Sequence, residues 1–174
     1  MNKQPADPGP VIHTLAAYRG TWAIAGGWAI DFFLGRKTRA HADTDVAVFR
    51  DEQSKLRASF PEWEFRLAIN GELVPWESER VVELPLHEIH ALTPLGTIEF
   101  LLNERRGDDW VYRRDSRIQR PLAHAILWAA GVPVLAAEIV LLYKSKDPRP
   151  SDSADLANAA PHLSADARAW LTAP

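Results

Sequence analysis

Residues 22–48 read WAIAGGWAIDFFLGRKTRAHADTDVAV, and the interpretation of the whole chain starts from this stretch. Residues 22–25 form a short apolar run that predicts a buried strand, and the run ends on Gly26 and Gly27. Residues 28–34 are apolar on all sides except for Asp31, which predicts a short enclosed helix that begins at the glycines. Glycine at such a junction permits a positive φ, and the first N–H groups of the helix point outward. This arrangement suits a bound phosphate.

Two aspartates stand just before a second apolar run, residues 46–49. In a strand, residues two apart point to the same side, so Asp43 and Asp45 should project together. Two adjacent carboxylates raise each other's cost of ionisation unless a cation lies between them. A divalent ion that prefers oxygen ligands, such as Mg²⁺, would remove this cost. The pair therefore predicts a metal site.

The double glycine at a helix start, the short gap and the two aspartates on a strand resemble the nucleotidyltransferase superfamily of the DNA polymerase β type. GGWAID followed by GRKTRAHADTDVAV is similar, more narrowly, to the aminoglycoside 2″-adenylyltransferase and lincosamide nucleotidyltransferase group. The resemblance is strong over residues 12–49 and loose over the later strands. It implies an enzyme that moves AMP from ATP to a hydroxyl of a small molecule, such as an aminoglycoside- or lincosamide-like antibiotic. It also implies two Mg²⁺ ions, with Asp43 and Asp45 as their main ligands.

Members of the superfamily usually add a third acidic residue on a later strand, which binds metal or takes the proton from the acceptor. The best match is Glu99, a carboxylate among the apolar residues of the run 97–102. A shifted register would place Asn103 or Glu104 at this position instead. The structural alternative is a glutamate on an edge strand that faces water.

Basic residues provide candidates for binding the triphosphate. Arg36 and Arg39 lie between the glycines and the aspartates, where the resemblance matches a GR-x-TR pattern, and we favour Arg39 while leaving Arg36 undecided. Lys144 and Lys146 resemble lysines that some relatives place against the nucleotide phosphates, although a lysine at a helix end also complements the helix dipole. The expected nucleotide site comprises Gly26, Gly27, Arg39, Lys144 and Lys146.

Composition limits the class of protein. The 174 residues are 47% hydrophobic and 25% charged, which is typical of one globular domain and not of a disordered or fibrous chain. A net charge of −3 argues against a protein that coats nucleic acid. The lack of cysteine excludes disulfides, thiolate metal sites and cysteine nucleophiles. The N-terminal residues lack a signal-peptide core, and the apolar run 132–143 is too short to cross a bilayer, so we expect a cytoplasmic protein with no membrane partner.

The remaining patterns predict an α/β (α+β) fold, a small mixed sheet flanked by helices, in one nucleotidyltransferase domain over residues 1–174. Residues 1–10 are expected to form a loose tail before a helix over residues 11–19. A helix over residues 52–59, capped by Asp51, should lead into a mostly antiparallel meander. Its strands are expected at residues 63–69, 72–76, 80–84, 87–92 and 97–102. After a strand pair that turns at Gly131, helices in residues 135–174 should pack on the domain, two of them beginning at Ser151 and Ser164.

Two other functions remain open. The same fold could modify RNA or protein, as toxin and antitoxin relatives of the superfamily do, and the aromatic and basic segment 110–120 is the one candidate RNA-binding face. The chain could also be a nucleotide-binding module without catalysis, which would follow if neither Glu99 nor Glu104 reaches the metal site. The sequence does not specify the donor base, the acceptor or the oligomeric state.

The charge of the acceptor site can also be anticipated. An acceptor with several amines should meet an acidic cleft, and six residues could supply its charge: Glu77, Glu79, Glu83, Glu88, Asp108 and Asp109. The histidines are weaker candidates, since His87 and His90 lie three apart in an expected strand and should face opposite sides. We therefore expect them to share no metal ion.

Overall fold

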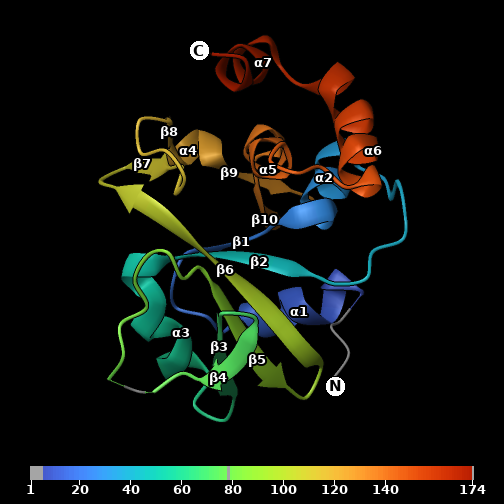
Figure 1. The fold of residues 1–174 in the computed structure, drawn as a ribbon. Coiled ribbons are helices and arrows are strands. Elements are labelled where there is room, and N and C mark those ends of the chain that lie inside the picture. Colours follow the sequence, from blue (N-terminus) through green and yellow to red (C-terminus); the bar gives the residue numbers. More distant parts are fainter. Residues whose placement is uncertain (1–5, 78, 174) are drawn as a thin grey trace.

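The computed structural model describes residues 6–77 and 79–173 of the chain and is built on a mixed β-sheet (Figure 1). Its strands are β1 (Trp22–Ile24), β2 (Asp45–Phe49), β3 (Glu64–Ile69), β4 (Glu72–Pro75), β5 (Glu88–Thr93), β6 (Gly96–Arg106), β7 (Asp109–Val111), β8 (Gln119–Pro121), β9 (Ile126–Ala129) and β10 (Val132–Leu135). They are ordered β4-β3-β5-β6-β2-β1-β10-β9, and β7 pairs with β6 and β8. The pairs β2–β6 and β1–β10 are parallel, and the other pairs are antiparallel.

Helices cover both faces of this sheet. They are α1 (Pro8–Leu15), α2 (Gly26–Leu34), α3 (Gln53–Ser59), α4 (Leu122–Ala125), α5 (Ala137–Lys144), α6 (Pro150–Ala159) and α7 (Ala165–Leu171), with short 3-10 turns at Arg50–Glu52 and Ala160–His162. In Figure 1, α2, α5, α6 and α7 lie on one side of β2 and β6, and α1 and α3 lie on the other. The mixed α/β fold class expected from the sequence is confirmed.

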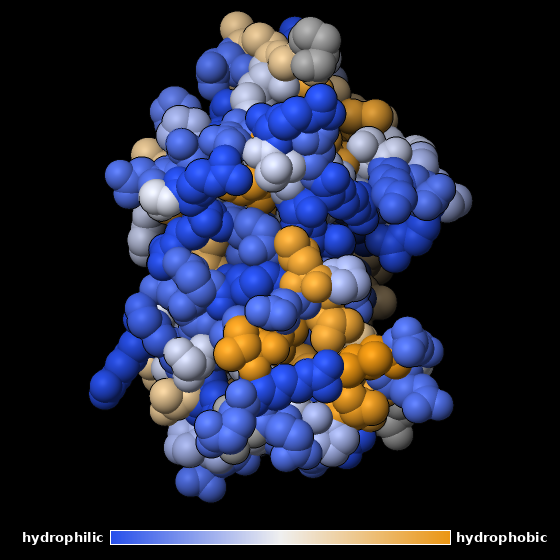
Figure 2. Space-filling view, turned by 60° about the vertical axis from the view of Figure 1, so that its left-hand side comes forward, coloured by the Kyte–Doolittle hydropathy of each residue, from blue (hydrophilic) through white to orange (hydrophobic). Residues whose placement is uncertain are grey.

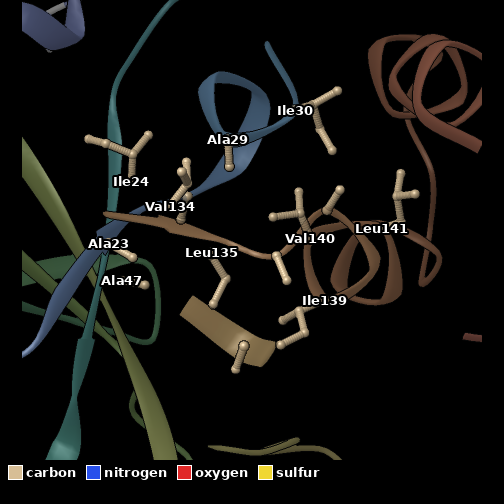
Figure 3. Close-up of a cluster of buried hydrophobic side chains, with 14 of the residues drawn as sticks. Ala23, Ile24, Ala29, Ile30, Ala47, Val134, Leu135, Ile139, Val140 and Leu141 are labelled. Atoms are coloured by element: carbon tan, nitrogen blue, oxygen red, sulfur yellow. The ribbon is translucent and has the colours of Figure 1, made fainter. Parts of the chain in front are cut away.

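The central strand β2 is buried on both faces, which explains its continuous apolar sequence. Val46 and Val48 pack into a cluster with residues of α1 and α3. Ala47 and Phe49 pack into a second cluster with residues of α2, β10 and α5, which Figure 3 shows in close-up. Because side chains alternate along a strand, Asp45 at the start of β2 shares the face of Ala47 and therefore looks toward α2 and α5.

Most elements expected from the sequence are present, with shifts at their ends. The helix α2 begins at Gly26, the meander β3–β6 is antiparallel, and Ser164 caps α7 by accepting a hydrogen bond from the N–H of Ala167 over 3.1 Å. The helix α1 begins earlier than expected, at Pro8, because Asp7 caps it through the N–H of Gly9. The loose tail predicted for residues 1–10 is therefore wrong from Pro8 onward, and residues 1–5 lie outside the described part.

The strand expected at residues 80–84 does not form. The backbone of Val82 is bonded by side chains instead, since its N–H donates to Oε1 of Gln53 over 2.6 Å and its carbonyl accepts from Nε2 of Gln53 and Nη1 of Arg50. Two expected caps are also wrong. Asp51 binds Nε of Arg105 instead of capping α3, and α6 is capped by Asp152, which accepts from the N–H of Arg149 over 3.0 Å.

The surface is mostly hydrophilic on the face seen in Figure 2, where hydrophobic side chains gather in the lower half. Within the described residues, no helix has the length and apolar character needed to cross a bilayer.

Candidate active site

Three carboxylates meet where β2 begins. The strands β2 and β6 run parallel, and their register places Glu99 directly beside Asp45. Asp43 lies just before the strand, which starts only at Asp45, and its charge acts on Asp45. The structure thus brings together Asp43, Asp45 and Glu99, the three residues that the sequence nominates as metal ligands.

The Asp45 carboxyl is poorly suited to carry a charge without a cation. Burial, together with the negative charges of Asp43 and Glu99, raises its pKa to about 7, while Lys144 and Arg149 act in the opposite direction. A set of oxygen ligands that repel one another at a half-buried position is the donor set that Mg²⁺ prefers. The residues present therefore fit the metal ion that the family resemblance implies.

Each glycine at the start of α2 makes room for a different side chain. Gly26 has φ +59°, and a Cβ there would lie 2.1 Å from Oδ2 of Asp45. A Cβ on Gly27 would lie 2.2 Å from Nη2 of Arg39 and 2.7 Å from Nδ1 of His41. The N-terminus of α2 therefore lies in contact with both the acidic group and the basic loop, in the position expected for a phosphate site.

The loop between α2 and β2 is held by Asp31. This buried carboxylate accepts hydrogen bonds from the N–H of Thr38 over 3.0 Å and contacts Nε2 of His41 over 2.5 Å. The His41 ring in turn lies 4.4 Å from the ring of Trp28, centroid to centroid. Asp31 thus orders the loop and does not bind Arg39 directly.

Arg39 and Lys144 meet at one buried aspartate of α6. Arg39 binds Asp155 with two hydrogen bonds of 2.9 Å, from Nε and Nη2, and Nζ of Lys144 lies 3.0 Å from Asp155. Lys144 also pairs with Asp152, which binds Nε of Arg149 over 3.0 Å. Arg39, Lys144 and Arg149 are therefore positioned by two aspartates of α6 that single-sequence patterns did not identify.

A cleft with a volume of about 290 Å³ opens beside these groups. Its walls come from the start of α2, from β2 and β6, from the end of α5 with the following loop, and from the loop between β7 and β8. Gly26, Lys144 and the exposed Lys146 of the expected nucleotide site line it, together with the metal-ligand candidate Asp45. Gly27, Arg39 and Arg36 are not among the lining residues. The cleft is also lined by charged residues that the sequence analysis did not assign to a small-molecule site, among them Arg113, Arg114, Asp147, Arg149 and Asp152.

His87 and His90 lie closer to the site than expected. Nε2 of His87 lies 3.2 Å and Nε2 of His90 lies 3.8 Å from Glu88, so the expectation that the two histidines face apart is wrong. His87 lies outside the strand, which frees it to turn toward Glu88. His90 pairs in register with Glu99, and ligand atoms of Glu88, His90 and Glu99 all lie within 4.8 Å of one another. Hydrogen bonds from His87 and His90 hold the pKa of Glu88 well below its usual range.

Glu99, Asn103 and Glu104, the three residues considered for the third acidic position, differ in their contacts and in their position relative to Asp45. Glu104 points away from Asp45 and binds Nε of Arg50 over 2.7 Å. Asn103 shares the face of Glu99, but its side chain accepts from Nε1 of Trp110 over 2.8 Å and donates to the carbonyl of Leu101. Glu99 is the member of this group that pairs in register with Asp45.

The segment 110–120 does not form the aromatic and basic face considered for RNA. Trp110 is fully buried and Tyr112 is 7% exposed, so neither ring is available for stacking on bases. Arg120 is buried in ion pairs with Glu138 over 2.6 Å and Asp166 over 2.8 Å. Of the six acidic residues considered for a polyamine site, Glu88 lines this cleft within the described residues. The other acidic residues that line it are Asp45, Asp147 and Asp152.

The chain is similar to several known proteins. A sequence profile of the aminoglycoside-2″-adenylyltransferase family matches residues 10–159. No curated protein matches the chain in a sequence search. The solution structure of the antibiotic-resistance factor ANT(2″)-Ia is similar, with 21% identity and a TM-score of 0.61, covering 94% of this chain and 88% of that chain.

Two ligand-bound structures are similar as well. ANT(2″)-Ia in complex with adenylyl-2″-tobramycin has 20% identity and a TM-score of 0.60, covering 94% of each chain. The lincosamide antibiotic adenylyltransferase LnuA, bound to lincomycin, has 14% identity and a TM-score of 0.59, covering 91% of this chain and 97% of that chain. At these identities, the likeness to solved structures shows the fold.

Proposed function

The chain belongs to the aminoglycoside-2″-adenylyltransferase family, and from this premise we propose that it transfers AMP from ATP to a hydroxyl group of a small molecule. It is a nucleotidyltransferase of the antibiotic adenylyltransferase group, and family membership implies a nucleotide donor. One observation carries the proposal: Asp45 lines the cleft at the N-terminus of α2, and it lies beside Glu99 and within the electrostatic influence of Asp43.

The reaction is a displacement at the α-phosphorus of ATP. The acceptor hydroxyl oxygen forms a bond to this phosphorus, the bond from the phosphorus to the bridging oxygen of the β-phosphate breaks, and pyrophosphate leaves with the electron pair. Glu99, which lies beside Asp45, would take the hydroxyl proton in this proposal. Asp43, Asp45 and Glu99 would hold Mg²⁺, which neutralises charge on the phosphate oxygens when it is bound.

The N-terminus of α2 and the cations of the cleft would bind the triphosphate. Gly26 and Gly27 leave room at the helix start, and Lys144 is held in the cleft by its two aspartates. Lys146 is exposed at the same cleft and can approach the phosphates directly. Arg39 binds Asp155, so we infer that it orders the site from behind Gly27 unless nucleotide binding opens this pair.

Tobramycin and lincomycin serve as reference acceptors in a transfer assay, because related structures contain an adenylylated tobramycin and a bound lincomycin. The competing idea of a non-catalytic module predicts an incomplete acidic set, and Glu99 beside Asp45 argues against it.

The test measures thermal unfolding with each nucleoside triphosphate, with and without Mg²⁺. A ligand at one hundred times its dissociation constant adds about 2.7 kcal/mol of stability. We expect a Mg²⁺-dependent rise in Tm with ATP that is lost in Asp43→Asn and kept in Asp108→Asn, which changes an exposed aspartate outside the cleft. Pyrophosphate release with an acceptor then reports transfer. A wild-type protein that gains no stability from any triphosphate with Mg²⁺ would contradict the proposed function.

A further inference from the structure

Two arginines sit side by side at the cleft, in the loop between β7 and β8. The guanidinium carbons of Arg113 and Arg114 each lie 5.6 Å from the ring centroid of Tyr143. Nη1 of Arg114 also donates to the hydroxyl of Tyr112 and to the carbonyl of Tyr143, both over 3.2 Å. The aromatic wall thus holds two neighbouring positive charges at the cleft.

Neither arginine has an anionic partner in residues 6–77 and 79–173. Other basic residues of the site do, since Arg39, Lys144 and Arg149 all bind aspartates of α6. Burial and the charge of Arg114 lower the pKa of Arg113, whose side chain is half-buried, while Arg114 is exposed at the cleft. An oxyanion from outside the protein could bind both guanidinium groups, because they bind carboxylate and phosphate with paired hydrogen bonds.

The arginines lie between the end of α5 and the start of β5, because they contact Tyr143, the residue before Lys144, and the charge of Glu88 acts on Arg113. The cations that act on Asp45 are Lys144 and Arg149, both at the end of α5 and the loop that follows. The charged groups that act on Arg113 include Glu88, at the start of β5. Since Glu88 lies close to Glu99, we place the arginines on the side where the acceptor hydroxyl would lose its proton.

We propose that the acceptor carries an acidic group, a carboxylate or a phosphate, besides its hydroxyl, and that Arg113 and Arg114 bind this group. This inference rests on the proposed function, whose acceptor it narrows. A polyamine such as an aminoglycoside meets the opposite of what it needs here, because two unpaired cations repel it. Among the acidic residues that line the cleft, Glu88 is the one whose charge acts on Arg113, and it also pairs with His87 and His90.

The first experiment tests whether Arg113 and Arg114 bind the donor, ATP. Mg²⁺-dependent stabilisation by ATP is measured for wild type, for the double variant Arg113→Gln/Arg114→Gln and for Arg117→Gln. Arg117 is in the same loop but is exposed, pairs with Asp115 and does not line the cleft. We expect equal ATP affinity in all three. A loss of about tenfold or more in the double variant alone would assign the arginines to the triphosphate and overturn the proposal.

The second experiment measures AMP transfer to hexoses that differ in charge: glucose, glucose 6-phosphate, glucuronate and glucosamine, with tobramycin as the polyamine. We expect one of the two anionic sugars to exceed glucose by about tenfold or more in kcat/KM, and the double variant to lose this advantage. Glucose 6-phosphate and glucuronate distinguish a phosphate from a carboxylate. Faster transfer to tobramycin or glucosamine would overturn the inference while leaving the transferase intact.

A third measurement covers the case in which none of these sugars is the right acceptor. The ATP-saturated protein with Mg²⁺ is titrated with inorganic phosphate and, separately, with acetate. Stabilisation by either anion that is lost in Arg113→Gln/Arg114→Gln and kept in Arg117→Gln supports the proposal. No stabilisation, or an equal effect on both variants, overturns it. A protein that binds no nucleotide at all would instead show the failure of the proposed function itself.

Discussion

The carboxylate of Asp45 lies against the Cα of Gly26, so closely that a Cβ at residue 26 would be 2.1 Å from Oδ2. A main-chain contact fixes the same junction, since the N–H of Ala25 donates to the carbonyl oxygen of Asp45 over 2.9 Å. The start of α2 and the start of β2 therefore meet at one point. A phosphate on the helix and a cation on the carboxylate would be neighbours there.

Substituting Gly26→Ala should remove both stability and activity. The added Cβ meets Asp45, and residue 26 has φ +59°, which L residues with a side chain rarely adopt. We expect the free energy of unfolding to fall by about 2–5 kcal/mol, combining left-handed strain with displacement of the carboxylate. Urea unfolding and pyrophosphate release measure the two effects.

Gly35→Ala is the matched control for this change. Gly35 has φ +65°, but no atom of the described residues lies within 4 Å of the position of its Cβ. The substitution Gly35→Ala should lower the free energy of unfolding only by the backbone strain, about 1–2 kcal/mol. The folded variant should keep its ATP affinity. Equal losses of affinity in the two variants would contradict a specific role for the contact between Gly26 and Asp45.

Asp45→Asn should stabilise the metal-free protein at pH 7 while abolishing Mg²⁺-dependent ATP binding. Burial and the charges of Asp43 and Glu99 raise the pKa of Asp45 to about 7, so ionisation of this carboxyl costs free energy in the folded state. A neutral amide of the same shape avoids that cost. We expect a gain of about 1–3 kcal/mol in urea unfolding with EDTA present. The exposed control Asp108→Asn should change neither quantity.

The same carboxyl gives the stability of the metal-free wild type a defined pH dependence. Its folded-state pKa of about 7 lies above the ordinary value of 3.8, so the folded protein binds more protons than the unfolded chain between these values. The contribution of Asp45 to stability should therefore fall as the pH rises from about 4 to about 7 and stay constant above that. Subtracting the profile of Asp45→Asn from that of wild type isolates this part. A flat difference would contradict the raised pKa.

How much of this site the sequence could reveal depended on distance along the chain. The glycines, Asp43 and Asp45 lie in one continuous stretch, so spacing and side-chain alternation were enough to predict the strand, the helix start and the acidic pair. The pairing of Arg39 with Asp155 joins residues far apart in sequence, and no local periodicity encodes it. The phosphate-binding role of Arg39 stays a prediction.

Unknown strand register was the second limit on predicting the site from the sequence. A strand slipped by one residue turns every side chain to the opposite face, so Glu99 and Glu104 could not be distinguished before β6 was paired with β2.

The basic residues of segment 110–120 were recognised in the sequence, but their surroundings in the fold were not predicted. Arg113 and Arg114 face the cleft, whereas Arg120 is buried in ion pairs, and a charge pattern alone does not distinguish them.

Comparing Glu99→Gln with Glu104→Gln tests the third acidic position. Glu99 lies beside Asp45, so its amide should slow AMP transfer by about 10²–10⁴-fold, the usual loss of a general base, in a protein that still folds. Glu104 binds Arg50 on the opposite face, so its amide should lower stability by about 1–3 kcal/mol and leave transfer unchanged. Steady-state kinetics and urea unfolding of both variants decide the assignment. The reverse pattern would move the catalytic role to Glu104.

Asp155→Asn tests whether α6 positions the cations of the site. Asp155 is fully buried, and although burial alone would raise its pKa, hydrogen bonds from Arg39 and Lys144 hold the pKa below its ordinary value. Removing its charge takes the shared anion from two half-buried cations, of which Lys144 keeps its pair with Asp152, and this should cost about 1–3 kcal/mol in urea unfolding. Because Arg39 lies behind Gly27 and Lys144 lines the cleft, ATP affinity should fall as well.

The control for this change is Asp115→Asn, which breaks the exposed pair of Asp115 with Arg117. An exposed pair adds little stability, so this variant should unfold like wild type and bind ATP equally well. If Asp155→Asn lowers stability but leaves ATP affinity intact, Asp155 joins α6 to α2 without positioning the nucleotide site. If both quantities fall together, and added salt does not restore the affinity, the aspartate sets the position of the cations that receive the triphosphate.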